Sequence, residues 1–135
     1  MFGFGGTRSK PLVLHVDDDK DICMIIRTVL EEMGLDTISA LNGPEGLALA
    51  KKKAPDLVIL DVRMPGMDGF EVCLQIKSDE KTRHIPVLMT TSMGTMKDVE
   101  KALANGADGY TIKPLNFPAF KEKVSKLLKL PPPAP

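Results

Sequence analysis

The sequence is poor in the residue types that mark several classes of protein. It has no tryptophan, one tyrosine and five phenylalanines among 135 residues, so we expect an aliphatic core and no aromatic platform for nucleic-acid bases. Its 18 basic and 18 acidic residues cancel, so no overall field favours direct binding to nucleic acid or to an anionic membrane. Two cysteines, Cys23 and Cys73, make no disulfide framework; they are expected to be packing residues of a cytoplasmic protein.

Long apolar runs are missing as well. No stretch approaches the roughly 20 residues that span a membrane, and the N-terminus lacks the apolar core of a signal peptide. We expect one domain over residues 11–130, which is long enough to bury a sizeable core. Residues 1–10 are glycine-rich and residues 131–135 are proline-rich, so a flexible lead and a short tail should flank that domain.

What the sequence does contain is a regular alternation of two apolar patterns. Short continuous runs predict five strands, at Leu12–Val16, Leu35–Ala40, Leu57–Leu60, Val87–Met89 and Tyr110–Ile112. Between and after them lie five helical patterns, over residues 22–33, 42–53, 68–76, 95–104 and 116–128. This βα alternation predicts an α/β fold with a parallel five-stranded sheet, helices on both faces and right-handed crossovers.

Polar side chains stand where four of these strands stop. They are Asp17-Asp18, Asp61, Thr91 and Lys113. In a parallel α/β sheet, ligands and chemistry gather at the carboxyl edge of the strands, so these groups should share one cleft. Hard carboxylate oxygens are what Mg²⁺ prefers.

The expected cleft suits phosphoryl chemistry. Asp61 stands alone on its strand and is our choice of nucleophile toward phosphorus, which would form an acyl phosphate. Asp17 and Asp18 would lie on the metal side. The metal and Lys113 would neutralise the phosphoryl oxygens, and the Thr91 hydroxyl could donate to the new phosphoryl group.

Four segments together resemble the receiver domain of two-component response regulators. They are Val16-Asp17-Asp18-Asp19, residues 60–69 (LDVRMPGMDG), residues 86–91 (PVLMTT) and residues 106–114 (GADGYTIKP). In order and spacing they match the family over about residues 12–128, and jointly they are a specific signal. The resemblance implies a flavodoxin-like, doubly wound (βα)5 sandwich with strand order 2-1-3-4-5.

The same resemblance implies roles for individual residues. Asp61 would be phosphorylated by a histidine kinase or a histidine phosphotransfer protein. Mg²⁺ would be held by Asp18, Asp61 and the backbone carbonyl of Arg63, with Asp17 acting through water. Thr91 and Lys113 would bind the phosphoryl group.

Switching and lifetime are implied too. Thr91 and Tyr110 would form the switch, and Arg63 and Met93 would tune hydrolysis of the phosphorylated state. The Lys113–Pro114 peptide would be cis. The protein would be a phosphoacceptor switch rather than an enzyme, and it would bind a downstream protein through its fourth helix, fifth strand and fifth helix. Output would then occur in trans, unless the chain is a piece of a longer protein.

Two other classes compete with this hypothesis. A phosphatase of the haloacid dehalogenase type also uses a strand-end aspartate, but it needs Thr or Val where Asp21 stands and a later acidic pair. A pseudo-receiver would work without phosphorylation, and such proteins usually lose an acid or the lysine, all of which are present here. A calcium loop is excluded because Ile22 occupies the required glycine position and Thr28 the bidentate glutamate position.

Several polar residues have a simpler explanation. Asp19, Asp21 and Asp68 are expected to cap or charge helix N-termini. His15 and His84 have no partner histidine or cysteine at metal spacing, so both are expected to be structural.

Overall fold

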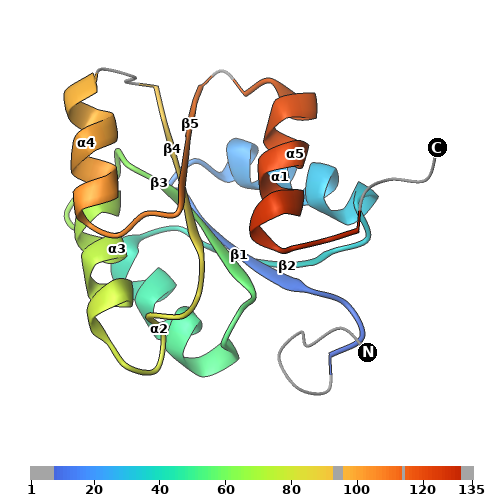
Figure 1. Ribbon diagram of the computed structural model, residues 1–135, viewed down its shortest axis with the longest axis horizontal. Coiled ribbons are helices and arrows are strands. Elements are labelled where there is room, and N and C mark those ends of the chain that lie inside the picture. The colour runs from blue at the N-terminus through green and yellow to red at the C-terminus, as the bar shows by residue number, and fades with distance from the viewer. Residues whose placement is uncertain (1–7, 93–95, 114, 132–135) are drawn as a thin grey trace.

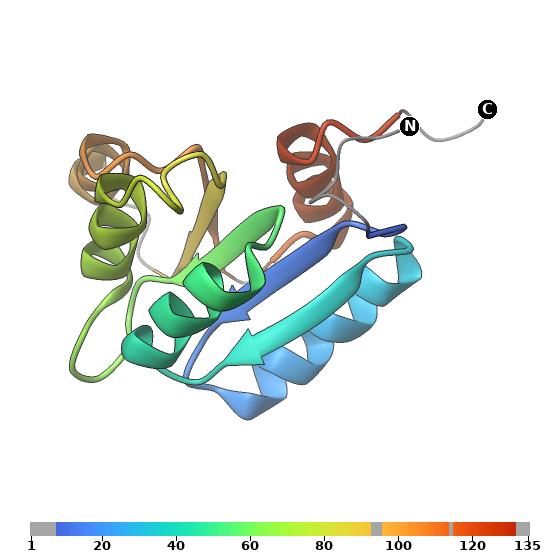
Figure 2. The same ribbon diagram turned by 90° about the horizontal axis from the view of Figure 1, so that it is seen from below.

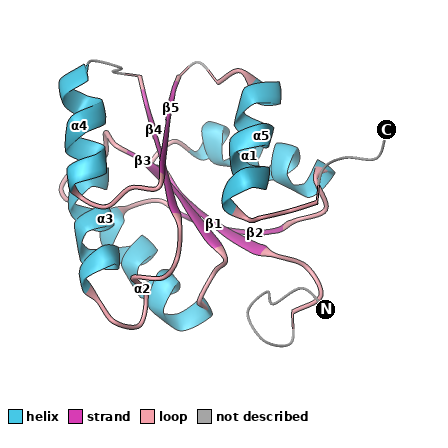
Figure 3. Cartoon of the chain, viewed as in Figure 1, coloured by secondary structure: helices cyan, strands magenta, loops and turns pink. Residues whose placement is uncertain are grey.

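The computed structural model describes residues 8–92, 96–113 and 115–131. Within them, five strands alternate with five helices (Figures 1 and 3). The strands are β1 (Leu12–Val16), β2 (Asp36–Ala40), β3 (Leu57–Asp61), β4 (Val87–Thr91) and β5 (Gly109–Ile112). The helices are α1 (Lys20–Glu32), α2 (Gly43–Lys53), α3 (Gly69–Ser78), α4 (Met96–Ala104) and α5 (Phe117–Leu127). The expected elements are therefore confirmed, with ends that shift by a residue or two.

All strand pairings are parallel and the sheet order is β2-β1-β3-β4-β5. β1, β3 and β4 are buried along their whole length, because helices cover them on both faces. β2 and β5 lie at the edges and are partly exposed. The predicted doubly wound α/β fold and its 2-1-3-4-5 order are confirmed.

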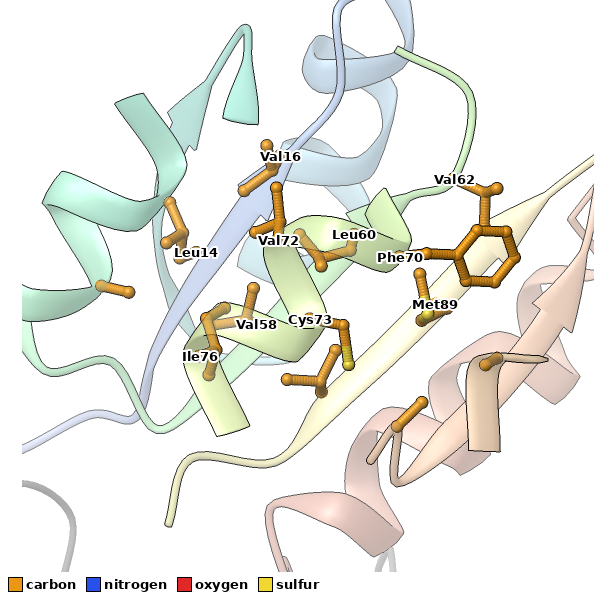
Figure 4. Close-up of a cluster of buried hydrophobic side chains, with 14 of the residues drawn as sticks. Leu14, Val16, Val58, Leu60, Val62, Phe70, Val72, Cys73, Ile76 and Met89 are labelled. Atoms are coloured by element: carbon orange, nitrogen blue, oxygen red, sulfur yellow. The ribbon is translucent and has the colours of Figure 1, made fainter. Parts of the chain in front are cut away.

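Two hydrophobic clusters fill the space between the sheet and its helices. One lies under α2, α3 and α4 and includes Leu60, Phe70, Val72 and Ile76, which Figure 4 shows in close-up. The other lies under α1 and α5 and includes Leu30, Phe120 and Val124. Seen from below, the two helical layers lie on opposite faces of the twisted sheet (Figure 2). Both layers hold the strand ends in place, which is what positions the polar site.

The helices begin where the sequence placed capping residues. Asp19, Asn42, Asp68 and Asn116 each accept a hydrogen bond from a backbone N–H of the first helical turn. The predicted N-terminal caps at Asp19 and Asp68 are therefore confirmed. Among the described residues, no helix is long and apolar enough to cross a membrane.

Candidate functional site

Three carboxylates meet at the carboxyl edge of the sheet, as the strand-end pattern predicted. Oxygen atoms of Asp17, Asp18 and Asp61 lie within 4.8 Å of one another. Asp17 and Asp61 are buried, with 1% and 5% of their surface exposed, while Asp18 is exposed. Their place follows from the fold, because parallel β1 and β3 are neighbours and end at the same edge.

Lys113 connects the two buried acids. Its Nζ donates to Asp17 Oδ2 at 3.2 Å and to Asp61 Oδ1 at 3.1 Å. The loop after β5 brings it there, and its backbone N–H donates to the carbonyl of Thr91 at the end of β4. One ammonium group therefore serves two carboxylates that come from different strands.

Burial and the neighbouring charges of the cleft shift the pKa values of Asp61 and Lys113. Burial raises the pKa of Asp61, and the negative charge of Asp17 raises it further, against the opposing effect of Lys113. Burial would lower the pKa of Lys113, but its hydrogen bond to Asp61 and the charges of both acids raise it overall. The carboxylates are crowded enough to repel one another, so the cleft favours a cation.

Asp17 is held by several hydrogen bonds besides the one from Lys113. Its N–H donates to Ala40 O, its Oδ1 accepts from Asp19 N at 2.9 Å, and its carbonyl accepts from Cys23 Sγ at 3.4 Å. Burial raises the pKa of the Cys23 thiol to about 11, so the thiol keeps its proton. Asp17 is thus buried and hydrogen-bonded through its backbone and side chain, while Asp18 is exposed to solvent.

His15 lies beside the site, which the sequence hypothesis missed when it treated this residue as structural only. It is 3% exposed, and its Nε2 lies 3.8 Å from Asp17 Oδ2. Burial lowers its pKa to about 4, so the ring is neutral near pH 7. The alternation of side chains along a strand could have predicted that His15 lies beside Asp17, because residues 15 and 17 point to the same face.

The remaining expected site residues lie around the same edge. Thr91 is the last residue of β4, and its side chain is hydrogen-bonded with that of Tyr110 on β5. Arg63 is exposed in the loop between β3 and α3. Met93 and Pro114 lie outside the described residues, so the tuning role of Met93 and the cis peptide stay predictions.

The donor set fits a magnesium ion. Three hard carboxylate groups converge within reach of one small cation, and two of them are held on neighbouring strands. No soft ligand shares the described cluster. The arrangement can hold a hard divalent cation beside a buried, single aspartate, which is the requirement for metal-assisted phosphoryl transfer.

The comparison with protein families decides the identity of this site. Residues 13–125 match the model of the response regulator receiver domain. The chain belongs to that family. It is a two-component response regulator receiver, a signalling module and not a classical enzyme, and its family works with histidine kinases or phosphotransfer proteins. Receiver domains generally bind Mg²⁺, and the acidic cluster of this receiver is of the kind they use.

Individual relatives support the assignment. The receiver is 40% identical over 119 residues to the DNA-binding dual master transcriptional regulator RpaA of Synechocystis, covering 88% of this chain and 49% of that protein. It is 34% identical over 116 residues to the polar-differentiation response regulator DivK of Brucella anthropi, covering 86% of this chain and 94% of DivK. The chain thus spans about half of one relative and nearly all of the other.

Solved structures agree with the fold. The chemotaxis protein CheY4 of Vibrio cholerae superimposes with a TM-score of 0.84 at 30% identity, over 88% of this chain and 99% of CheY4. A putative response regulator from Chloroflexus aurantiacus gives 0.86 at 30% identity, over 90% of this chain and 99% of that chain.

Proposed function

We propose that this receiver accepts a phosphoryl group on Asp61 in a Mg²⁺-dependent reaction and thereby changes its binding to a downstream protein. The observation that carries the proposal is the bridge from Lys113 to Asp17 and Asp61 beside exposed Asp18. It combines the buried carboxylate of Asp61, the ammonium of Lys113 and a group of acids that could hold a second cation. A phosphoryl group needs these three elements.

In the proposed reaction, a carboxylate oxygen of Asp61 forms a bond to phosphorus while the bond from phosphorus to the donor breaks. The donor is a phosphohistidine of a kinase or phosphotransfer protein, and its imidazole leaves with the bonding electrons. Lys113 is released from Asp61 Oδ1 and pairs with a phosphoryl oxygen, and the Thr91 hydroxyl donates to another. A bound Mg²⁺ would supply further charge neutralisation, held by Asp18, Asp61 and the Arg63 carbonyl, with Asp17 acting through water.

Switching is proposed to pass through Thr91 and Tyr110. The hydrogen bond between their side chains joins the end of β4 to β5. When Thr91 donates its proton to a phosphoryl oxygen, it can no longer donate to Tyr110, and we propose that Tyr110 then changes its rotamer. The effect would reach the surface formed by α4, β5 and α5, where four large apolar side chains are exposed: Met96, Leu103, Ile112 and Phe117. A downstream protein is proposed to bind there.

The test is incubation of the purified protein with a small acyl phosphate and Mg²⁺, followed by intact mass measurement and assay of released phosphate. One added phosphoryl group per chain supports the proposal. Sustained turnover would instead indicate a phosphatase, and an unchanged mass would indicate a receiver that works without phosphorylation. Omission of Mg²⁺ should prevent the modification.

A further inference from the structure

The loop between β3 and α3 closes on itself. The backbone N–H of Gly69, the first residue of α3, donates to the carbonyl of Val62 at 2.9 Å, directly after β3 ends. Residues 62–69 therefore leave the sheet and return to the same point. This closed loop carries Arg63, whose carbonyl is a proposed Mg²⁺ ligand. It directly follows the proposed phosphoacceptor Asp61, the last residue of β3.

Closure brings Gly69 into direct contact with the backbone of Asp61. A Cβ atom at position 69 would overlap the Asp61 carbonyl oxygen, and it would lie 2.9 Å from Val62 Cα and 3.0 Å from the Asp61 carbonyl carbon. All of these atoms are main chain, so no side-chain rotation relieves the overlap. Gly69 has no positive φ, so the requirement for glycine at this position is proximity and not backbone conformation.

Other tightly packed glycines differ in this respect. At Gly46 the nearest atoms belong to the side chain of Val16, and at Gly109 they belong to Leu88 and Leu127. A small rearrangement of side chains can accommodate a methyl group at such positions. Among the glycines of the described residues, Gly69 presses on the main chain of a proposed site residue.

We infer that Gly69 is a positioning residue for the metal site: because it has no side chain, α3 can close the loop 62–69 onto the backbone that carries both Asp61 and Arg63. The inference rests on the proposed function, since it concerns the affinity of the same Mg²⁺ site. It adds a residue that contacts neither the metal nor the phosphoryl group. Groups that orient ligands in this indirect way commonly change metal affinity when they are altered.

The first test compares Gly69→Ala with Gly109→Ala by Mg²⁺ titration calorimetry, at a temperature where circular dichroism shows both variants folded. Both variants add one methyl group at a crowded position, but the crowding atoms are main chain at Gly69 and side-chain ends at Gly109. Only Gly69→Ala should weaken Mg²⁺ binding, by about tenfold or more. Gly109 starts β5 at the opposite edge of the sheet, so Gly109→Ala should bind Mg²⁺ as the parent does.

A milder series keeps the inference testable if Gly69→Ala does not fold. Asp68 Oδ1 caps α3 by accepting from Glu71 N at 3.0 Å, and Asn42 Oδ1 caps α2 in the same way with Glu45 N at 2.8 Å. Asp68→Ala loosens the start of α3 next to Gly69, whereas Asp68→Asn removes the charge and keeps a cap. Asn42→Ala is the matched loss of a cap on another helix.

Asp68→Ala is expected to weaken Mg²⁺ binding several-fold relative to Asp68→Asn, while Asn42→Ala loses stability without losing affinity. Parental Mg²⁺ affinity in Gly69→Ala would overturn the inference. If that variant is unfolded, equal affinities in Asp68→Ala and Asp68→Asn would overturn it. Absence of any Mg²⁺ binding by the parent protein would instead overturn the proposed function.

Discussion

The two edges of the sheet use the same kinds of charged groups in opposite ways. At the amino edge, Asp56 and Asp108 directly precede β3 and β5, and each accepts from the first backbone N–H of a neighbouring strand, Leu12 and Val87 respectively. Each also has a cation of its own: Arg8 lies 3.2 Å from Asp56, and Lys77 lies 2.8 Å from Asp108. Each of these two acids therefore has its own cation.

At the carboxyl edge, by contrast, three acids lie together, and the ammonium of Lys113 pairs with two of them, Asp17 and Asp61. The pKa of Asp61 is raised, first by its burial and then by the negative charge of Asp17. At the amino edge, therefore, the charged groups hold neighbouring strands together. The carboxyl edge keeps a deficit of positive charge, which a metal ion and a phosphoryl reaction can use.

The largest effect is expected at the carboxyl edge, from Asp61→Asn. The amide has nearly the shape of the carboxylate but is not a nucleophile, so phosphate uptake from a small acyl phosphate with Mg²⁺ should be abolished while the fold stays intact. Intact mass and circular dichroism measure the two effects. Undiminished labelling of the variant would remove Asp61 from its proposed role.

Asp56→Asn is the matched change at the other edge. It should keep full phosphate uptake, because Asp56 lies at the amino end of β3, whereas Asp61 ends the same strand. It should lose stability in urea unfolding, since the ion pair with Arg8 is lost. Loss of labelling in this control would mean that the assay reports stability instead of chemistry.

The carboxyl edge was predictable from sequence, whereas the amino edge was not. Strand ends are set by local apolar runs, and parallel strands must end at one edge, so Asp17, Asp61, Thr91 and Lys113 could be placed together without coordinates. The pairing of Lys77 with Asp108 depends on how the end of α3 packs against the loop before β5. Nothing local in the sequence encodes that distance.

Two features of the site itself also escaped the sequence. The place of His15 beside Asp17 follows from strand periodicity, but its burial, with 3% of its surface exposed, comes from tertiary packing. The need for glycine at position 69 comes from contact with the Asp61 backbone, which only the closed loop reveals. Strand alternation and capping motifs predicted the architecture, and close tertiary contacts account for what they missed.

Lys77→Met should cause the next largest effect, this time on stability alone. Lys77 Nζ pairs with Asp108 and donates to the Ile85 carbonyl at 2.6 Å, so the variant removes this donor from the carbonyl and leaves Asp108 with the Val87 N–H but without its cation. Such a loss costs about 1–3 kcal/mol of unfolding free energy. Urea unfolding measures it. Phosphate uptake should be unchanged, and a parallel loss of uptake would show that the two edges are coupled.

The lifetime of the phosphorylated state should depend on Arg63 and Met93. Neither side chain is an acid or amide suited to positioning an attacking water, so spontaneous hydrolysis should be slow for a receiver. Arg63→Asn combined with Met93→Glu should speed phosphate loss several-fold, a change of about 1 kcal/mol in the barrier. Time courses of phosphate loss after removal of the donor measure this rate. An unchanged rate would contradict the tuning role of Arg63 and Met93 and leave the receiver assignment standing.

The smallest expected change in stability comes from Asp18→Ala in the metal-free protein. Removing one of three mutually repelling acids should raise the melting temperature, but only slightly, because Asp18 is exposed and water screens its charge. Mg²⁺ binds only the folded state and should stabilise the parent protein, whereas the variant should lose this response. Melting curves with and without Mg²⁺ separate the two effects, and Asp19→Ala, which alters the neighbouring cap, is the control that keeps the response. A fully retained Mg²⁺ shift in Asp18→Ala would contradict the metal assignment, since the uncompensated charge of the carboxyl edge would then serve some other purpose.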